Sequence, residues 1–137
     1  MTTINATKQE FVNLINGLYQ VQEVKGKQFS LLISKNIDIL KTELKSLEEA
    51  ATPSEEFMVL AKKVNELANS KEEEAKSKID KLEEENKELV EARRVQMETI
   101  QKMMEEKLEI KLNSIDEKVL PEDVTAKQIN GIIKLIK

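Results

Sequence analysis

The sequence contains no cysteine, histidine or tryptophan, and these absences exclude several kinds of chemistry. Without cysteine the chain has no disulfide framework and no thiolate nucleophile. Without cysteine and histidine it lacks the usual ligands of zinc, haem and iron–sulfur clusters, and it lacks the commonest general base of enzymes. We therefore expect no metal site and no cofactor.

Glycine, proline and aromatic residues are scarce as well: the 137 residues include 3 Gly, 2 Pro, 3 Phe and 1 Tyr. Glu, Lys, Leu and Ala dominate instead, and these residues favour helices. The length corresponds to one domain with a modest core. The sequence thus predicts an all-α fold, a single helical domain over 1–137. We expect an elongated antiparallel helical bundle or coiled-coil hairpin with a short C-terminal helix.

Charges of both signs are interspersed along the chain, with 26 acidic and 22 basic side chains and a net charge of −4. Nucleic-acid-binding proteins usually carry a basic stripe, whereas the pair Arg93 and Arg94 is bracketed by Glu91 and Glu98. No apolar run approaches the ~20 residues of a membrane span, and the first residues do not resemble a signal peptide. We expect a soluble, cytoplasmic protein that binds neither nucleic acid nor membrane.

Start signals and apolar spacing place the first two helices. Thr7 to Glu10 forms a capping box, in which the hydroxyl and the carboxylate satisfy free backbone N–H groups. Apolar residues then follow at helical spacing to Val24, and Gly26 can adopt the left-handed conformation that ends a helix. A second helix begins near residue 27 or 28. It carries a regular apolar seam that is typical of helix–helix packing: Ile33, Ile37, Leu40, Leu44, Leu47 and Ala51.

The strongest start signal is Thr52-Pro53-Ser54-Glu55, with Thr as N-cap, Pro at the first helical position and Glu three residues after the cap. It predicts a tight corner and a third helix to residue 68, antiparallel to the second helix. Near Asn69 two alternatives remain open. Either Ser70 to Glu73 forms a new capping box, or the helix continues without a break.

Between Lys71 and Arg94, 16 of 24 residues are charged. We therefore predict a solvated helical arm over 71–95, and we assign 1–68 and 105–137 to the bundle core. Glu–Lys pairs four residues apart support such a helix by about 0.2–0.5 kcal/mol each. Runs of carboxylates on a polar helix face stay hydrated and form a solvated surface. Since no phosphate-binding loop is present either, we expect no catalytic residues and no enzyme.

A thin apolar stripe continues through the arm and forms the candidate interaction surface: Ile79, Leu82, Asn86, Leu89, Met97, Ile100 and Met104. Asn86 either fixes the register of a coiled coil or is a plain surface residue. The methionines either fill a core or form an adaptable binding face. An unbroken helix over 70–113 would span roughly 66 Å at 1.5 Å per residue, which is longer than a compact chain of this size. We therefore expect an elongated molecule, or a homodimer in which the long helix pairs with that of a second copy.

Beyond residue 105 the spacing of apolar residues again predicts buried elements. Residues 109–115 alternate apolar and polar side chains, which indicates a short strand that could pair with Thr2–Asn5. Thr125 to Gln128 forms another capping box. It opens a last helix that we expect to dock on the first two, with one apolar face: Ile129, Ile132, Ile133 and Ile136.

Two parts of the chain, 1–68 and 105–137, resemble small, mostly helical proteins encoded by tailed phages and prophages. The resemblance is carried by Thr7-x-x-Glu10-Phe11-x-x-Leu14-x-x-Gly17-Leu18, Lys25-Gly26-x-x-Phe29, Lys35-Asn36-x-x-x-Leu40-x-x-Glu43, Pro53-x-x-Glu56-Phe57 and Leu120-Pro121-Glu122-Asp123-Val124-Thr125 with the isoleucine-rich end. It implies a viral accessory or virion-associated protein that acts by contact, in the host cytoplasm, without catalysis.

The expected function is therefore a non-catalytic protein–protein interaction, in which a phage accessory protein modulates or blocks a host or phage protein through helical surfaces. The alternative is a structural component of the virion, a tail-assembly component or an assembly chaperone.

Overall fold

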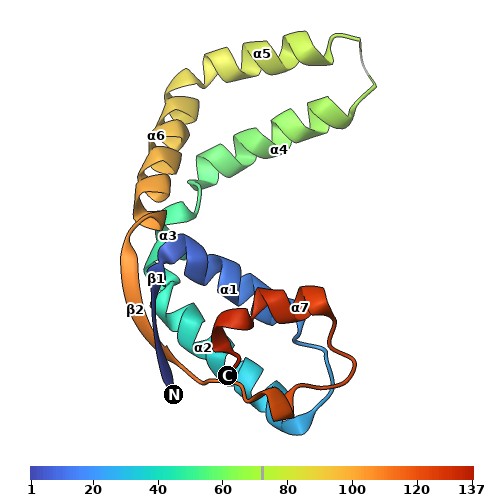
Figure 1. Ribbon diagram of the computed structural model, residues 1–137. Coiled ribbons are helices and arrows are strands. Elements are labelled where there is room, and N and C mark those ends of the chain that lie inside the picture. Colours follow the sequence, from blue (N-terminus) through green and yellow to red (C-terminus); the bar gives the residue numbers. More distant parts are fainter. Residues whose placement is uncertain (72) are drawn as a thin grey trace. The chain divides into compact units, whose positions relative to one another are not determined.

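The computed structural model describes residues 1–71 and 73–137 and divides the chain into two compact units. Unit 1 comprises Met1–Leu47 and Lys102–Lys137, and unit 2 comprises Glu48–Gln101. Unit 2 is thus inserted along the chain between the two halves of unit 1 (Figure 1). The described residues form seven α-helices and two strands, so the predicted mostly helical fold is confirmed.

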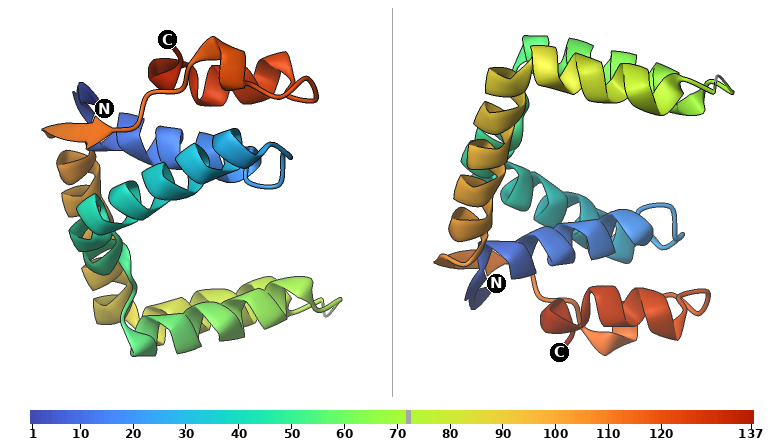
Figure 2. Two further views of the ribbon diagram at one scale, coloured as in Figure 1. Left: turned by 90° about the horizontal axis from the view of Figure 1, so that it is seen from below. Right: turned by 90° about the horizontal axis from the view of Figure 1, so that it is seen from above.

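Unit 1 combines a small sheet with helices. Its elements are β1 (Thr2–Thr7), α1 (Lys8–Gln20), α2 (Lys27–Glu43), β2 (Lys107–Leu112) and α7 (Ala126–Gly131), with 3₁₀ turns at Glu117–Val119 and Ile133–Leu135. Helix α1 lies between α2 and α7 (Figure 2). The predicted apolar seam of the second helix is buried from Ile33 to Leu47, but the helix is divided at Leu44 into α2 and α3 (Lys45–Ala51). The core of unit 1 also contains other fully buried side chains: Phe11, Leu18, Phe29, Leu112, Ile115, Ile132 and Leu135.

The two strands pair antiparallel, with Thr2 opposite Leu112 and Thr7 opposite Lys107, which confirms the predicted pairing of Thr2–Asn5 with a strand that includes residue 109. The strand β2 begins at Lys107 and ends at Leu112, so it does not extend to residue 115 as predicted. The prediction that one helix could continue to residue 113 is wrong, because α6 (Lys87–Met104) ends before the strand. Alternating side chains of β2 are buried at Ile110 and Leu112, and this period of two cannot be accommodated on a helix.

Both capping boxes of unit 1, at Thr7 and at Thr125, are present as predicted. Helix α1 ends at Gln20, earlier than the apolar spacing indicated, because the chain turns at the buried Val21. Gly26 has the expected positive φ, 147°, but it immediately precedes α2 instead of ending α1.

Helix α7 crosses α1 at a contact between two glycines. It packs chiefly against α1, whereas the sequence predicted contact with both of the first two helices. A Cβ atom added to Gly17 would lie 2.2 Å from the carbonyl oxygen of Gly131. The two helix backbones therefore approach as closely as they do because Gly17 has no side chain.

The end of β2 is held by a buried polar residue of α2. Asn36 is 0% exposed; its Nδ2 donates to the Asn113 carbonyl at 2.9 Å, and its Oδ1 accepts from the Asn113 N–H at 2.7 Å. The side chain thus replaces a strand partner. Just beyond, Ile115 pairs with the C-terminal segment, receiving a bond from the Lys137 N–H at 2.9 Å.

Unit 2 is built from helices: the end of α3 (Lys45–Ala51), then α4 (Glu55–Asn69), α5 (Ala75–Glu85) and most of α6. Helices α4 and α5 lie side by side (Figure 1). Residues 48–68, which the sequence grouped with the bundle core, therefore cluster with the charged segment.

The predicted helix start at Thr52 is wrong, and neither alternative near Asn69 is observed, because α4 ends at Asn69 and α5 begins at Ala75. The N-cap of α4 is Ser54, whose hydroxyl accepts from the Phe57 N–H at 3.2 Å, while the Thr52 hydroxyl donates back to the Glu48 carbonyl at 2.9 Å. Ser70 ends α4 instead of starting a new helix, because its hydroxyl donates to the carbonyl of Leu67 at 2.7 Å.

Candidate functional site

The structure does not bring the seven residues of the candidate interaction surface together on one exposed face. Ile79, Leu82 and Leu89 are half-buried, Ile100 is buried and Met97 is exposed. Met104 is half-buried and lies in the part of α6 that belongs to unit 1. A large part of the predicted stripe thus serves packing within the chain.

Asn86 divides the predicted long helix, since α5 ends at Glu85 and α6 begins at Lys87. Its Nδ2 donates to the Leu82 carbonyl at 2.8 Å, and its backbone N–H also bonds to the last carbonyls of α5. Asn86 therefore caps the end of its own helix.

The large apolar side chains that the described part of unit 2 exposes are Met58 and Val59 on α4 and Val90, Val95 and Met97 on α6. We call these five residues the unit 2 apolar set; each is between 37 and 55% exposed. In the described part of unit 2 the buried hydrophobic residues are Leu60 and Ile100 alone, against 17 in unit 1. The sequence predicted only Met97 of these five, because Val90 and Val95 lie beside the predicted stripe and Met58 and Val59 lie on a different helix.

Side chains of α6 hold the corner between α3 and α4 in place. Gln96 donates through Nε2 to the carbonyls of Ala50 at 2.8 Å and Thr52 at 2.9 Å, and Arg93 donates to that of Ala51 at 2.9 Å. The Arg93 guanidinium also lies 5.7 Å from the centre of the Phe57 ring. These bonds satisfy carbonyls that the end of α3 leaves without helical partners, so α3, α4 and α6 are fixed to one another.

The second arginine, Arg94, is engaged by acidic neighbours on its own helix. It forms ion pairs with Glu91, at 2.5 Å, and with Glu98. The hydrogen bond from Arg94 lowers the pKa of Glu91, and both carboxylates raise the pKa of Arg94. Both arginines that the sequence singled out thus have partners within the chain.

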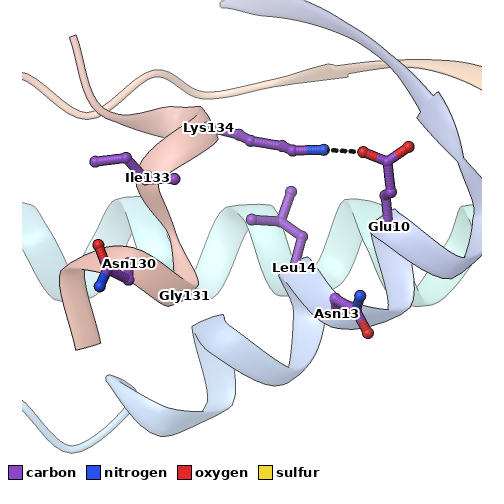
Figure 3. A pocket seen from close by; sticks show the side chains of 7 residues that line it. All are labelled: Glu10, Asn13, Leu14, Asn130, Gly131, Ile133 and Lys134. Carbon is purple, nitrogen blue, oxygen red and sulfur yellow. Dashed lines mark hydrogen bonds and ion pairs between the residues drawn. The ribbon is translucent and has the colours of Figure 1, made fainter. Parts of the chain in front are cut away.

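Unit 1 has a cavity of about 290 Å³ where α1 meets the C-terminal segment (Figure 3). Its lining consists of Glu10, Asn13, Leu14, Asn130, Gly131, Ile133 and Lys134. The Lys134 ammonium binds the Glu10 carboxylate; this bond, with that from the Thr7 backbone, lowers the pKa of Glu10. The ion pair thus favours the ionised form of the Glu10 carboxylate, which is a poor general acid.

Within 1–71 and 73–137 no cluster of three or more acidic side chains is arranged to bind a metal ion. Glu72, the first residue of an acidic run, lies outside the described residues. No helix of the described part combines the length and the apolar character needed to cross a membrane.

Comparisons with protein-family models, with curated proteins and with solved structures give no significant match to this chain.

Proposed function

We propose that the protein acts by binding another protein through unit 2, without catalysis. The observation that carries this proposal is the exposure of the unit 2 apolar set on a unit that buries so few of its own apolar side chains. Exposed apolar surface framed by charged residues is characteristic of sites where proteins bind one another. The corner held by Arg93 and Gln96 supports this role, because a rigid surface loses little entropy on binding.

Helix α6 offers the most regular part of this surface. Val90 and Met97 are seven residues apart, so they share one face, and Arg94 lies between them with its acidic partners. Such a face suits a helical partner in coiled-coil pairing, or a groove that accepts an amphipathic helix. Methionine adapts its shape to the partner.

The resemblance to proteins of tailed phages and prophages supplies the setting. In this proposal the chain is a phage accessory protein in the host cytoplasm that modulates or blocks a host or phage protein. A structural or tail-assembly role, or that of an assembly chaperone, is the second candidate. Mass spectrometry of purified particles separates these roles, because a virion component is present in particles and an accessory protein or chaperone is not.

The double variant V90E/M97E tests the proposed surface. Both side chains are exposed, so the fold should be retained, whereas binding should weaken at least about tenfold as charge replaces apolar contacts. The measurement is quantitative capture from extract of infected cells, followed by titration with the purified partner.

The matched control is T99E/Q101E, which adds the same charge at exposed polar positions of α6. It should bind as the wild type does. Equal binding by V90E/M97E and the wild type, or no partner for the wild type in any extract, would contradict the proposal.

A further inference from the structure

Strand β1 has an outer edge whose backbone groups point away from β2. The Lys8 N–H donates to the Glu106 carbonyl at 2.9 Å, so these two residues form a hydrogen-bonded pair. In an antiparallel ladder such pairs alternate with pairs that are not bonded to each other. The register then directs the N–H and C=O groups of Thr3 and Asn5 outward. The Thr7 N–H follows the same rule, since it donates to the Glu10 carboxylate at 3.2 Å.

This outer edge is uncharged and open. Thr3 and Asn5 are exposed, and in the part of the chain that the structure describes their outward backbone groups have no partner. The side chain of Ile4, between them, is half-buried. A sheet of only two strands is marginally stable, and an unblocked strand edge can form backbone hydrogen bonds with another strand.

The outer edge of β2 is protected by contrast. The first backbone group beyond it, on Asn113, is bound by Asn36. The exposed side chains along β2 are Lys107, Glu109 and Lys111, and charged residues of this kind block strand addition. The open edge of the sheet is therefore that of β1.

We propose that β1 pairs antiparallel with β1 of a second copy of this chain, about a two-fold axis at Ile4. Thr3 of each copy lies opposite Asn5 of the other, so the two pairs exchange four backbone hydrogen bonds and the two Ile4 side chains meet. The result is a four-stranded sheet in the order β2-β1-β1-β2. This inference concerns unit 1 and is independent of the surface proposed on unit 2.

The outer edge of β1 is complementary to itself, which favours a second copy of this chain as its partner. The register at Ile4 uses every free outward group of Thr3 and Asn5 and opposes no like charges. A register centred on Asn5 would instead oppose Thr3 to Thr7, whose N–H is already bound by Glu10. A two-fold axis through β2 would place Glu109 opposite itself and Lys107 opposite Lys111, and like charges directly opposite are unfavourable.

Sedimentation equilibrium of the full chain from about 10 μM to about 1 mM tests the proposal, because four backbone hydrogen bonds and one pair of isoleucines form a small interface that should associate weakly. The wild type should dimerise. Asn5→Pro removes an outward N–H that β2 does not use, so it should give a monomer with an unchanged circular dichroism spectrum. Glu109→Pro is the matched control on the other edge and should remain a dimer.

A pair of charge variants tests the register and does not depend on proline. T3K/N5K places Lys opposite Lys twice across the axis and should weaken dimerisation at least about tenfold, an effect that added salt reduces. T3E/N5K places Glu opposite Lys twice. It also matches Lys111 and Glu109 within the chain, so it should dimerise at least as well as the wild type.

A wild type that stays monomeric over the whole range overturns the proposal and leaves this edge to a strand of a different protein. A dimer that survives both Asn5→Pro and T3K/N5K overturns it as well. So does a dimer that is lost in Glu109→Pro and kept in Asn5→Pro.

Discussion

The crossing of α1 and α7 depends on the side chain that Gly17 lacks. In an exposed helix Gly→Ala stabilises by about 0.5–1 kcal/mol, yet here the new Cβ would clash with a backbone oxygen that cannot move independently. We expect Gly17→Ala to destabilise unit 1 by about 1–3 kcal/mol, measured by urea unfolding. The overpacking cost outweighs the gain in helix propensity.

Gly131→Ala is the comparison for that variant. Its Cβ would meet the Cα of Gly17 at 3.1 Å, a contact that a small shift relieves. The loss of stability should therefore be smaller than for Gly17→Ala. The opposite order would show that the contact between the helices differs from the one described.

The ion pair between Glu10 and Lys134 gives unit 1 a dependence on pH. The pKa of Glu10 is lowered in the folded chain, so its contribution to stability is present above the ordinary carboxyl pKa and is lost as pH falls through the lowered value. Glu10→Gln keeps a capping side chain but loses the charge. We expect the variant to be less stable than the wild type at neutral pH and equally stable in strong acid, by thermal unfolding at a series of pH values.

Lys134→Gln should reproduce this pattern, because it removes the other partner. A difference between Glu10→Gln and the wild type that keeps its full size in strong acid would show that packing, not charge, is responsible.

Among the elements, helix starts in unit 1 were predictable and those in unit 2 were not. At Thr7 and Thr125 the hydrogen bonds of the capping box form between residues three apart in the sequence, so the sequence pattern alone identifies these helix starts. At Thr52-Pro53-Ser54 two hydroxyl residues compete for the cap. Thr52 bonds back into α3 and leaves the role to Ser54, a choice that depends on the preceding helix.

Substitution of these two hydroxyls distinguishes the caps. Ser54→Ala should destabilise α4 by about 1 kcal/mol, because the Phe57 N–H loses its acceptor. Thr52→Ala removes a hydroxyl that bonds within α3 and should cost less. Amide hydrogen exchange of Phe57 measures the effect directly, and faster exchange in Thr52→Ala than in Ser54→Ala would contradict the assignment.

The candidate site was predictable only in part, for a reason that also lies in the elements. The spacing of apolar residues identifies side chains that share one helix face. It does not show whether that face packs within the chain or against a partner. Ile79 and Leu82 are half-buried although their helix is largely polar, and Met97 is exposed on the same predicted stripe. The break at Asn86 arises from a side chain that bonds to its own helix, which spacing cannot reveal.

On the scale of the whole molecule, the two units differ in how much apolar surface they bury. Seventeen of the buried hydrophobic residues belong to unit 1, whereas Leu60 and Ile100 belong to unit 2. Regions with few buried apolar contacts open more easily. We expect amide hydrogen exchange to be faster in α4 and α5 than in α1, α2 and β2, and a bound protein partner to slow it in unit 2. Uniform protection of both units in the free chain would contradict this expectation.

The pairing of β1 with β2 also limits when unit 1 can finish folding during synthesis. During synthesis β1 leaves the ribosome before β2 has been translated. Every residue of unit 2 is translated between the two strands. The nascent chain therefore leaves β1 without its partner strand until residues 107–112 have been made. Shortening the insert would bring the two strands together sooner, and loop-closure entropy grows slowly enough with length that the finished sheet would gain little from it.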